Sequence, residues 1–176
     1  RSIIDKLSEA SCAGVEINLI IRGICCILPG IEGYTENIRV FSLVGRFLEH
    51  HRVYMFGQKD ERKIYISSAD IMTRNLARRV EIACPVLDPE LKSRIEHTAE
   101  VILSDNVKLR ELKNDGNYIR VTAGTEKRIN AQDIFIEEAK AGVVEILGED
   151  TGFREDRGIN VFFSRINAMF SDRQKS

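Results

Sequence analysis

Apolar residues recur along the chain with two different periods, and these periods predict alternating helices and strands. Near the start, Ile3, Ile4 and Leu7 lie at helical spacing. A nearly continuous apolar run over residues 15–21 follows, which is typical of a strand buried on both faces. Further runs of β-type residues predict strands over residues 38–44, 53–56, 63–67 and 80–84. Residues 53–56 and 63–67 form a predicted hairpin, because a glycine and clustered charges lie between them.

The clearest predicted helix begins with Asp88 as the N-cap and Pro89 in the first turn, and it continues to about residue 103. Its apolar stripe consists of Leu91, Ile95, Ala99 and Ile102, with Glu90, Lys92, Arg94 and Glu96 expected to face water. Two more helices are predicted over residues 131–141 and 160–170. Strands that alternate with helices predict an α/β domain, a mixed β-sheet flanked by helices.

Length and composition are those of one globular domain, with 176 residues, of which 43% are hydrophobic and 30% charged. The net charge of −1 gives no global attraction for polyanions, so any anion site must be local. Four cysteines among aliphatic neighbours predict reduced, buried thiols rather than a zinc site or disulfides. The chain starts without methionine and enters its first helix at once, which leads us to expect a missing upstream portion.

Candidate chemistry gathers on both sides of the predicted hairpin. The residues are Arg46, His50, His51 and Arg52 before its first strand, and Ser67, Ser68, Asp70, Arg74, Arg78 and Arg79 after its second. Phosphoryl transfer needs fixed cations on the non-bridging oxygens, hydroxyl donors, and an imidazole that titrates near neutral pH. We therefore expect these two groups of residues to meet across the hairpin as a phosphate site.

Spacing alone leaves structural alternatives open. A His-His pair at a strand start is often a surface feature, and the three arginines from 74 to 79 could be a solvated face or partners for Asp70 and Glu81. The two serines could cap the following turn. His97 falls opposite the apolar stripe of its helix and is expected to be exposed and without a role.

Four long blocks, in this order along the chain, resemble the C-terminal domain of bacterial polyphosphate kinase. They are AGVEINLIIRGICCILPGIEG, NIRVFSLVGRFLEHHRVYMF, YISSADIMTRNLARRVE and DPELKSRIEHTAEVILSDNVKLRELKNDGNYIRV. The resemblance implies a phospholipase D-like half as the fold. It also implies a catalytic domain over residues 1–140, cut from a longer enzyme, with an unrecognised C-terminal extension over residues 141–176.

The resemblance further implies an ATP:polyphosphate phosphotransferase, which reversibly moves the terminal phosphate of ATP onto polyphosphate through a phosphohistidine. That histidine and the Mg²⁺ ligands are expected in the missing upstream domain, so the isolated domain should be inactive. Expected partners are ATP or ADP, inorganic polyphosphate, the upstream domains and, in the full-length protein, further copies of the enzyme, but no nucleic acid. The expected location is the cytoplasm, with a peripheral position at the inner membrane left open.

Carried over onto this chain, the resemblance makes His50 the family's second active-site histidine and Arg22 an arginine that contacts the nucleotide phosphates. As imidazolium, His50 would stabilise the transferring phosphoryl group or protonate the departing oxygen. Further phosphate ligands implied by the matched blocks are Arg46, Ser68, Arg74 and Arg79, while His51 is expected to be a neighbour only. Two alternatives remain: a phospholipase D-like phosphodiesterase half, and a non-catalytic module that binds polyphosphate. Arg52 and Asp70 replace the Lys and Asn of the phospholipase D motif, which weakens the first alternative.

Overall fold

A computed structural model describes residues 1–58, 61–122 and 127–147 of the chain. The chain divides into two compact units, Arg1–Phe135 and Ile136–Ser176. The predicted helix over residues 160–170 lies outside the described residues. In the part of the chain that is described, no helix has the length and apolar character needed to cross a membrane.

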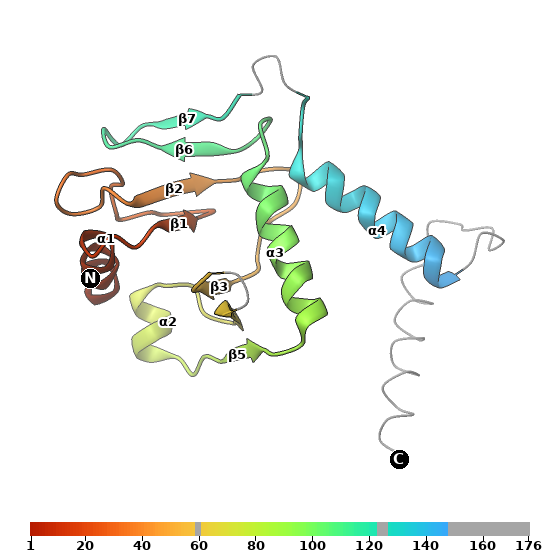
Figure 1. Ribbon diagram of the computed structural model, residues 1–176, viewed down its shortest axis with the longest axis horizontal. Helices are drawn as coiled ribbons and strands as arrows, with labels where there is room; N and C mark the ends of the chain where they lie inside the picture. The colour runs from red at the N-terminus through yellow and green to blue at the C-terminus, as the bar shows by residue number, and fades with distance from the viewer. Residues whose placement is uncertain (59–60, 123–126, 148–176) are drawn as a thin grey trace. The chain divides into compact units, whose positions relative to one another are not determined.

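Helices and strands alternate along the chain, which confirms the α/β prediction (Figure 1). In order they are α1 (Ser2–Cys12), β1 (Ile17–Ile20), β2 (Ile38–Ser42), β3 (Val53–Phe56), β4 (Lys63–Ser67), α2 (Thr73–Arg78), β5 (Ala83–Val86), α3 (Pro89–Leu103), β6 (Arg110–Leu112), β7 (Tyr118–Arg120) and α4 (Ala131–Leu147). The β3–β4 hairpin and α3 have the predicted bounds, whereas α4 continues to Leu147, past the predicted end at residue 141. Helix α2 and the β6–β7 hairpin were not predicted.

The strands form two sheets. The first has the order β1-β2-β6-β7, with β1 parallel to β2 and the other pairs antiparallel. Strands β6 and β7 are joined by a turn at Gly116, whose φ of 86° is a conformation that favours glycine. The second sheet has the order β3-β4-β5 and is antiparallel throughout.

The hydrophobic core lies on both sides of strand β2, because alternate side chains of this strand point to opposite faces of the first sheet. On one face Ile38 and Val40 pack with Ile27 and Leu112, and α1 covers this cluster through Ile4 and Leu7. On the other face Phe41 and Leu43 pack against a second cluster, which includes Val101, Ile102, Leu109 and Ala131. Burial on both faces therefore fixes β2 at the centre of the domain.

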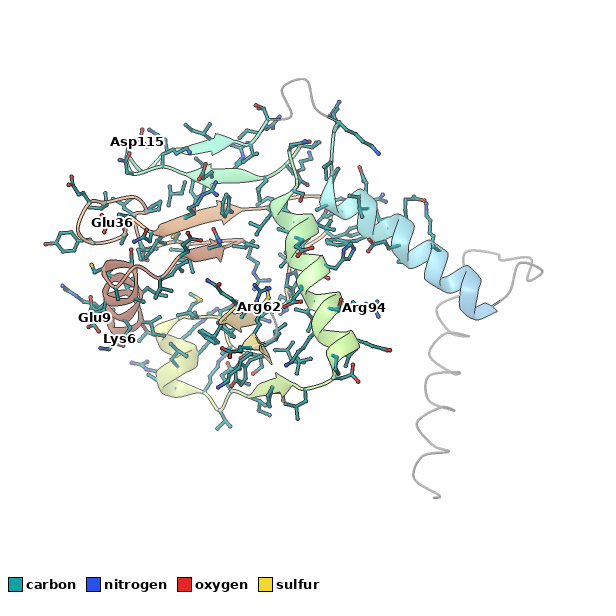
Figure 2. The ribbon with its side chains drawn as sticks, viewed as in Figure 1. Lys6, Glu9, Glu36, Arg62, Arg94 and Asp115 are labelled. Atoms are coloured by element: carbon teal, nitrogen blue, oxygen red, sulfur yellow. The ribbon has the colours of Figure 1, made fainter. Side chains whose placement is uncertain are left out.

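Helix α3 connects the two sheets and is tied to the β3–β4 hairpin by Arg62 (Figure 2). The guanidinium of Arg62 donates to Glu96 at 3.0 Å, and Lys92 donates to the carbonyl oxygen of Arg62 at 3.4 Å. Lys92 and Glu96 were predicted to face water, and they are half-buried because they meet Arg62. Leu91 of the predicted apolar stripe is 53% exposed, since it lies in the first turn, beyond the cluster that holds Ile102.

Two burial predictions are also corrected. Strand β1 is not buried on both faces, because Asn18 and Ile20 on one face are exposed, Ile20 by 40%. Three of the four cysteines, Cys12, Cys26 and Cys84, are exposed rather than buried, and all four are free. Cys84 lies on β5, which is an edge strand of the second sheet.

A fully buried carboxylate, that of Asp105, fastens the segment after α3 to the start of α4. Its Oδ1 accepts hydrogen bonds from the backbone N–H groups of Val107, Lys108 and Leu109 at 2.8, 2.6 and 3.2 Å. Its Oδ2 accepts from the N–H of Ala131 at 2.8 Å. One side chain thus satisfies four backbone donors, which otherwise carry a desolvation cost.

We expect Asp105→Ala to lower the free energy of unfolding by about 3 kcal/mol or more, because it leaves buried donors unpaired. Asp105→Asn retains one acceptor oxygen and should have a smaller effect. The matched control is Asp115→Ala, at the exposed β6–β7 turn (Figure 2), which should have a clearly smaller effect. Urea unfolding of the three variants measures these differences, and equal effects of the two alanine substitutions would contradict the assigned role of Asp105.

Candidate functional site

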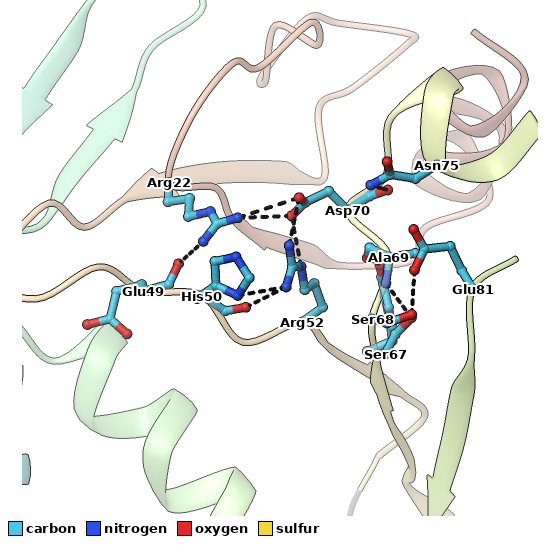
Figure 3. Close-up of polar contacts among 11 residues, drawn as sticks. Arg22, Glu49, His50, Arg52, Ser67, Ser68, Ala69, Asp70, Asn75 and Glu81 are labelled. Carbon is cyan, nitrogen blue, oxygen red and sulfur yellow. Dashed lines mark hydrogen bonds and ion pairs between the residues drawn. The ribbon is translucent and has the colours of Figure 1, made fainter. Parts of the chain in front are cut away.

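The predicted site residues Arg22 and His50 lie at one end of the β3–β4 hairpin (Figure 3). The antiparallel register pairs Val53 with Ile66, so the start of β3 lies beside the end of β4. His50 and Arg52 directly precede β3, and Asp70 follows β4 by three residues. Arg22 follows β1 of the other sheet and reaches the same place.

Asp70 is the centre of this group because it binds two guanidiniums. Its carboxylate accepts from Arg52 Nε at 3.0 Å and from Arg52 Nη2 at 2.9 Å, a bidentate pair. Arg22 Nη2 approaches the same carboxylate at the longer distances of 3.4 and 3.5 Å. The hydrogen bonds from Arg52 lower the pKa of Asp70, and those to Asp70 raise the pKa of Arg52. Asp70 therefore stays ionised and holds Arg52 firmly and Arg22 loosely.

The two arginines also hold the backbone around His50. Arg22 Nη1 donates to the carbonyl oxygen of Glu49 at 2.7 Å, and Arg52 Nη1 donates to that of His50 at 2.9 Å. Arg52 Nη1 also lies 2.9 Å from His50 Nδ1. The imidazole is thus fixed at its backbone and at one ring nitrogen, while the residue as a whole is exposed.

The segment before His50 is anchored by Gln132 in the first turn of α4. Gln132 accepts from the N–H of Phe47 at 3.0 Å, and its amide donates to the carbonyl oxygen of Phe47 at 2.9 Å and to Glu49 Oε1 at 2.6 Å. Gly45 passes so close that a Cβ there would lie 2.3 Å from Gln132 Oε1. This buried glutamine lies 82 positions after His50 and belongs to no motif, so no sequence pattern indicated its role.

Three hydrogen bonds hold the turn that carries Asp70. Tyr54 on β3 donates its hydroxyl to the carbonyl oxygen of Ala69 at 2.9 Å, and the side-chain amide of Asn75 donates to that of Asp70 at 3.3 Å. Ser67 accepts from the N–H of Ala69 at 3.1 Å. These contacts set the direction in which Asp70 points.

Ser68, predicted as a phosphate ligand, uses its hydroxyl within the domain. The hydroxyl donates to the carboxylate of Glu81 and accepts from the N–H of Ile82 at 3.1 Å. A contact with phosphate remains a prediction, and it would require the hydroxyl to exchange Glu81 for the phosphate.

The other predicted ligands lie outside the network around Asp70. Arg46 is exposed, and its guanidinium lies 5.3 Å from the ring centroid of Phe47. Arg74 and Arg79 are also exposed, and among the residues that the structure covers they make no ion pair. The alternative that pairs the arginines from 74 to 79 with Asp70 and Glu81 is wrong, because in the described residues Asp70 binds Arg22 and Arg52, and Glu81 binds Ser68. Their role as phosphate ligands remains a prediction.

The chemistry of the group follows from its charges and donors. Two guanidiniums share one carboxylate, so the group keeps a net positive charge. Arg52 donates to Asp70 and His50 through all three of its nitrogens, whereas Arg22 has N–H groups to spare. A Mg²⁺ ion does not fit here, because the carboxylate oxygens of Asp70 both face guanidiniums. Arg22 and the imidazole of His50 can instead bind an anion with several oxygens.

Fold and site together define an α/β domain with a small cationic site at its strand ends, suited to phosphate groups. The sequence matches the family described as "Polyphosphate kinase C-terminal domain 2" over residues 1–132. The chain belongs to this family, as its resemblance to polyphosphate kinase predicted.

Curated relatives agree with this assignment. The chain is 53% identical to "Polyphosphate kinase" of Bacillus cereus over 132 residues, which are 75% of this chain and 19% of that protein. It is 42% identical to "Polyphosphate kinase" of Escherichia coli over the same shares of the two chains. The crystal structure of polyphosphate kinase from Porphyromonas gingivalis aligns with a TM-score of 0.76 and 42% identity, covering 81% of this chain and 22% of that chain. The chain thus spans about a fifth of the length of the relatives it matches.

The lowered pKa of Asp70 predicts how its contribution to stability depends on pH. A carboxylate whose pKa is lower in the native state stabilises it above the unfolded pKa of about 3.9 and loses this effect as pH falls through the native pKa. We expect wild type to exceed Asp70→Asn in unfolding free energy at pH 7, and the difference to shrink below about pH 4.

Urea unfolding at a series of pH values measures this difference. The control is Asp5→Asn, because the carboxylate of Asp5 on α1 is 57% exposed and forms only a long contact with Arg1. The assigned ion pairs would be contradicted if the difference in unfolding free energy between wild type and Asp70→Asn stays constant from pH 7 to below about pH 4.

Proposed function

We propose that this domain supplies one wall of the active site of an ATP:polyphosphate phosphotransferase. The observation that carries the proposal is the meeting of Arg22 and His50, which lie next to strands of two different sheets, in the network around Asp70. The polyphosphate kinase names of the relatives support the reaction. The proposed ligands are ATP or ADP and inorganic polyphosphate.

Arg22 is the proposed phosphate ligand. Its contact with Asp70 is long, at 3.4 to 3.5 Å, and its side chain is 28% exposed. An incoming phosphate can replace the weak contact with Asp70 by stronger, charge-assisted hydrogen bonds. The contact from Arg22 to the carbonyl oxygen of Glu49 would meanwhile keep the guanidinium in place.

His50 is proposed to face the transferring phosphoryl group. In phosphoryl transfer, positioning and electrostatic stabilisation supply nearly all of the catalysis, and both fit an imidazole held by Arg52. The nucleophilic histidine and the Mg²⁺ ligands are proposed to lie in another part of the enzyme. For this reason we propose that the chain alone binds phosphates but does not transfer them.

Arg22→Ala should weaken the binding of tripolyphosphate to this chain by about tenfold or more, because it removes a charge-assisted contact worth about 1.5–3 kcal/mol. The control is Arg94→Ala, which removes an equal charge from the exposed side of α3 (Figure 2). Calorimetric titration at two salt concentrations separates the specific contact from general attraction. Equal losses in the two variants would argue against a phosphate site at Arg22.

His50→Ala in the complete enzyme that carries this domain should lower the rate of polyphosphate synthesis about 10²-fold to 10⁴-fold. His97→Ala removes the matched histidine on α3 and should leave the rate close to wild type. The assay follows polyphosphate formed from ATP. Near-normal turnover in His50→Ala, together with tight binding of tripolyphosphate, would favour the alternative of a non-catalytic binding module.

A further inference from the structure

In both His50 and His51 the ring nitrogen Nδ1 lies near a charged group, which is a guanidinium for His50 and a carboxylate for His51. Nδ1 of His50 lies 2.9 Å from Nη1 of Arg52. Nδ1 of His51 lies 3.5 Å from the carboxylate oxygen Oε2 of Glu49. A neutral imidazole carries its proton on one nitrogen and accepts at the other, so the partner of Nδ1 decides where the proton lies.

Arg52 determines whether Nδ1 of His50 carries a proton, because a guanidinium has five N–H donors, has no acceptor and keeps its proton in proteins. The ion pair with Asp70 reinforces this, since its hydrogen bonds raise the pKa of Arg52 further. A contact of 2.9 Å between Arg52 Nη1 and His50 Nδ1 is therefore an N–H donated to an unprotonated nitrogen. A proton on Nδ1 would place two donors against each other.

We propose that Arg52, held by Asp70, locks His50 as the neutral tautomer with its proton on Nε2, and that His50 acts as a hydrogen-bond donor to phosphate rather than as an imidazolium. Arg52 is thus a positioning residue. This inference rests on the proposed function, in which His50 faces the phosphoryl group, and it replaces the imidazolium role expected from the family resemblance.

Three features of the site fit a donor of this kind. Nε2 is the opposite ring nitrogen from the one that Arg52 occupies, and within residues 1–58, 61–122 and 127–147 it has no hydrogen-bond partner. Arg52 is held in a bidentate ion pair at 2.9 and 3.0 Å, so its Nη1 cannot turn away from the ring without breaking that pair. The positive charge needed by a phosphate is already supplied by Arg22, because the charge of Arg52 is paired with Asp70.

The tautomer can be measured directly in this chain by long-range ¹H–¹⁵N correlation spectra, which distinguish protonated from unprotonated ring nitrogens. The chain has three histidines, and His51→Gln and His97→Gln identify the signals of His50. The spectra are recorded near pH 8, above the ordinary histidine pKa of about 6.5. We expect an unprotonated Nδ1 in His50. A proton on Nδ1 of His50 would overturn the proposal.

The consequence for catalysis is tested in the complete enzyme with Arg52→Met. Loss of the lock should lower kcat about 10-fold to 100-fold, in addition to any rise in KM for ATP that follows when Asp70, without Arg52, binds Arg22 more tightly. Arg22→Ala should instead raise KM, and Arg94→Met is the matched control. A rise in KM with unchanged kcat in Arg52→Met would overturn the positioning role.

The two proposals can fail separately. If His50→Ala retains full activity while His50 shows an unprotonated Nδ1, the proposed function fails and the tautomer assignment stands. If His50→Ala abolishes activity while His50 carries a proton on Nδ1, the proposed function stands and the tautomer assignment fails. The spectra of wild type require no substitution at the site, so they give an answer even if Arg52→Met does not fold.

Discussion

The bidentate ion pair between Asp70 and Arg52 is the interaction on which the rest of the site depends. Without the carboxylate, two guanidiniums would face one another with uncompensated charge, and like charges in a partly buried place repel strongly. With it, Arg52 is fixed by 2.9 and 3.0 Å contacts and Arg22 by weaker ones. One carboxylate thus divides two similar cations into a structural one and one that is available to a ligand.

Strand pairing and contacts between strands and helices bring these groups together. The antiparallel register of β3 and β4 places the residues before one strand beside those after the other. Strand β1 of the first sheet delivers Arg22 to the same end, and Gln132 of α4 fastens the segment that leads to His50. The site is therefore built from segments far apart in the sequence, each held by the packed core.

Local elements with strong signals could be predicted from the sequence, and contacts between distant side chains could not. The hairpin and α3 followed from β-type runs and from Asp88-Pro89, because turns and caps depend on near neighbours. Strands β6 and β7 have three residues each, too few for a visible period, although Asp115-Gly116 marks their turn. Arg22 and His50 were predicted through the family resemblance. Their link through Asp70 depends on how the two sheets lie relative to each other. No local sequence pattern determines this arrangement.

In this site Asp70 reserves Arg52 for His50 and leaves Arg22 for phosphate. Both roles would be visible in a crystal structure of the complete enzyme with bound tripolyphosphate. We expect phosphate oxygens within hydrogen-bond distance of Arg22 and of Nε2 of His50, with the two contacts between Arg52 and Asp70 unbroken. A phosphate bound to Arg52 in place of Asp70, or one bound elsewhere while Arg22 remains on Asp70, would contradict these roles.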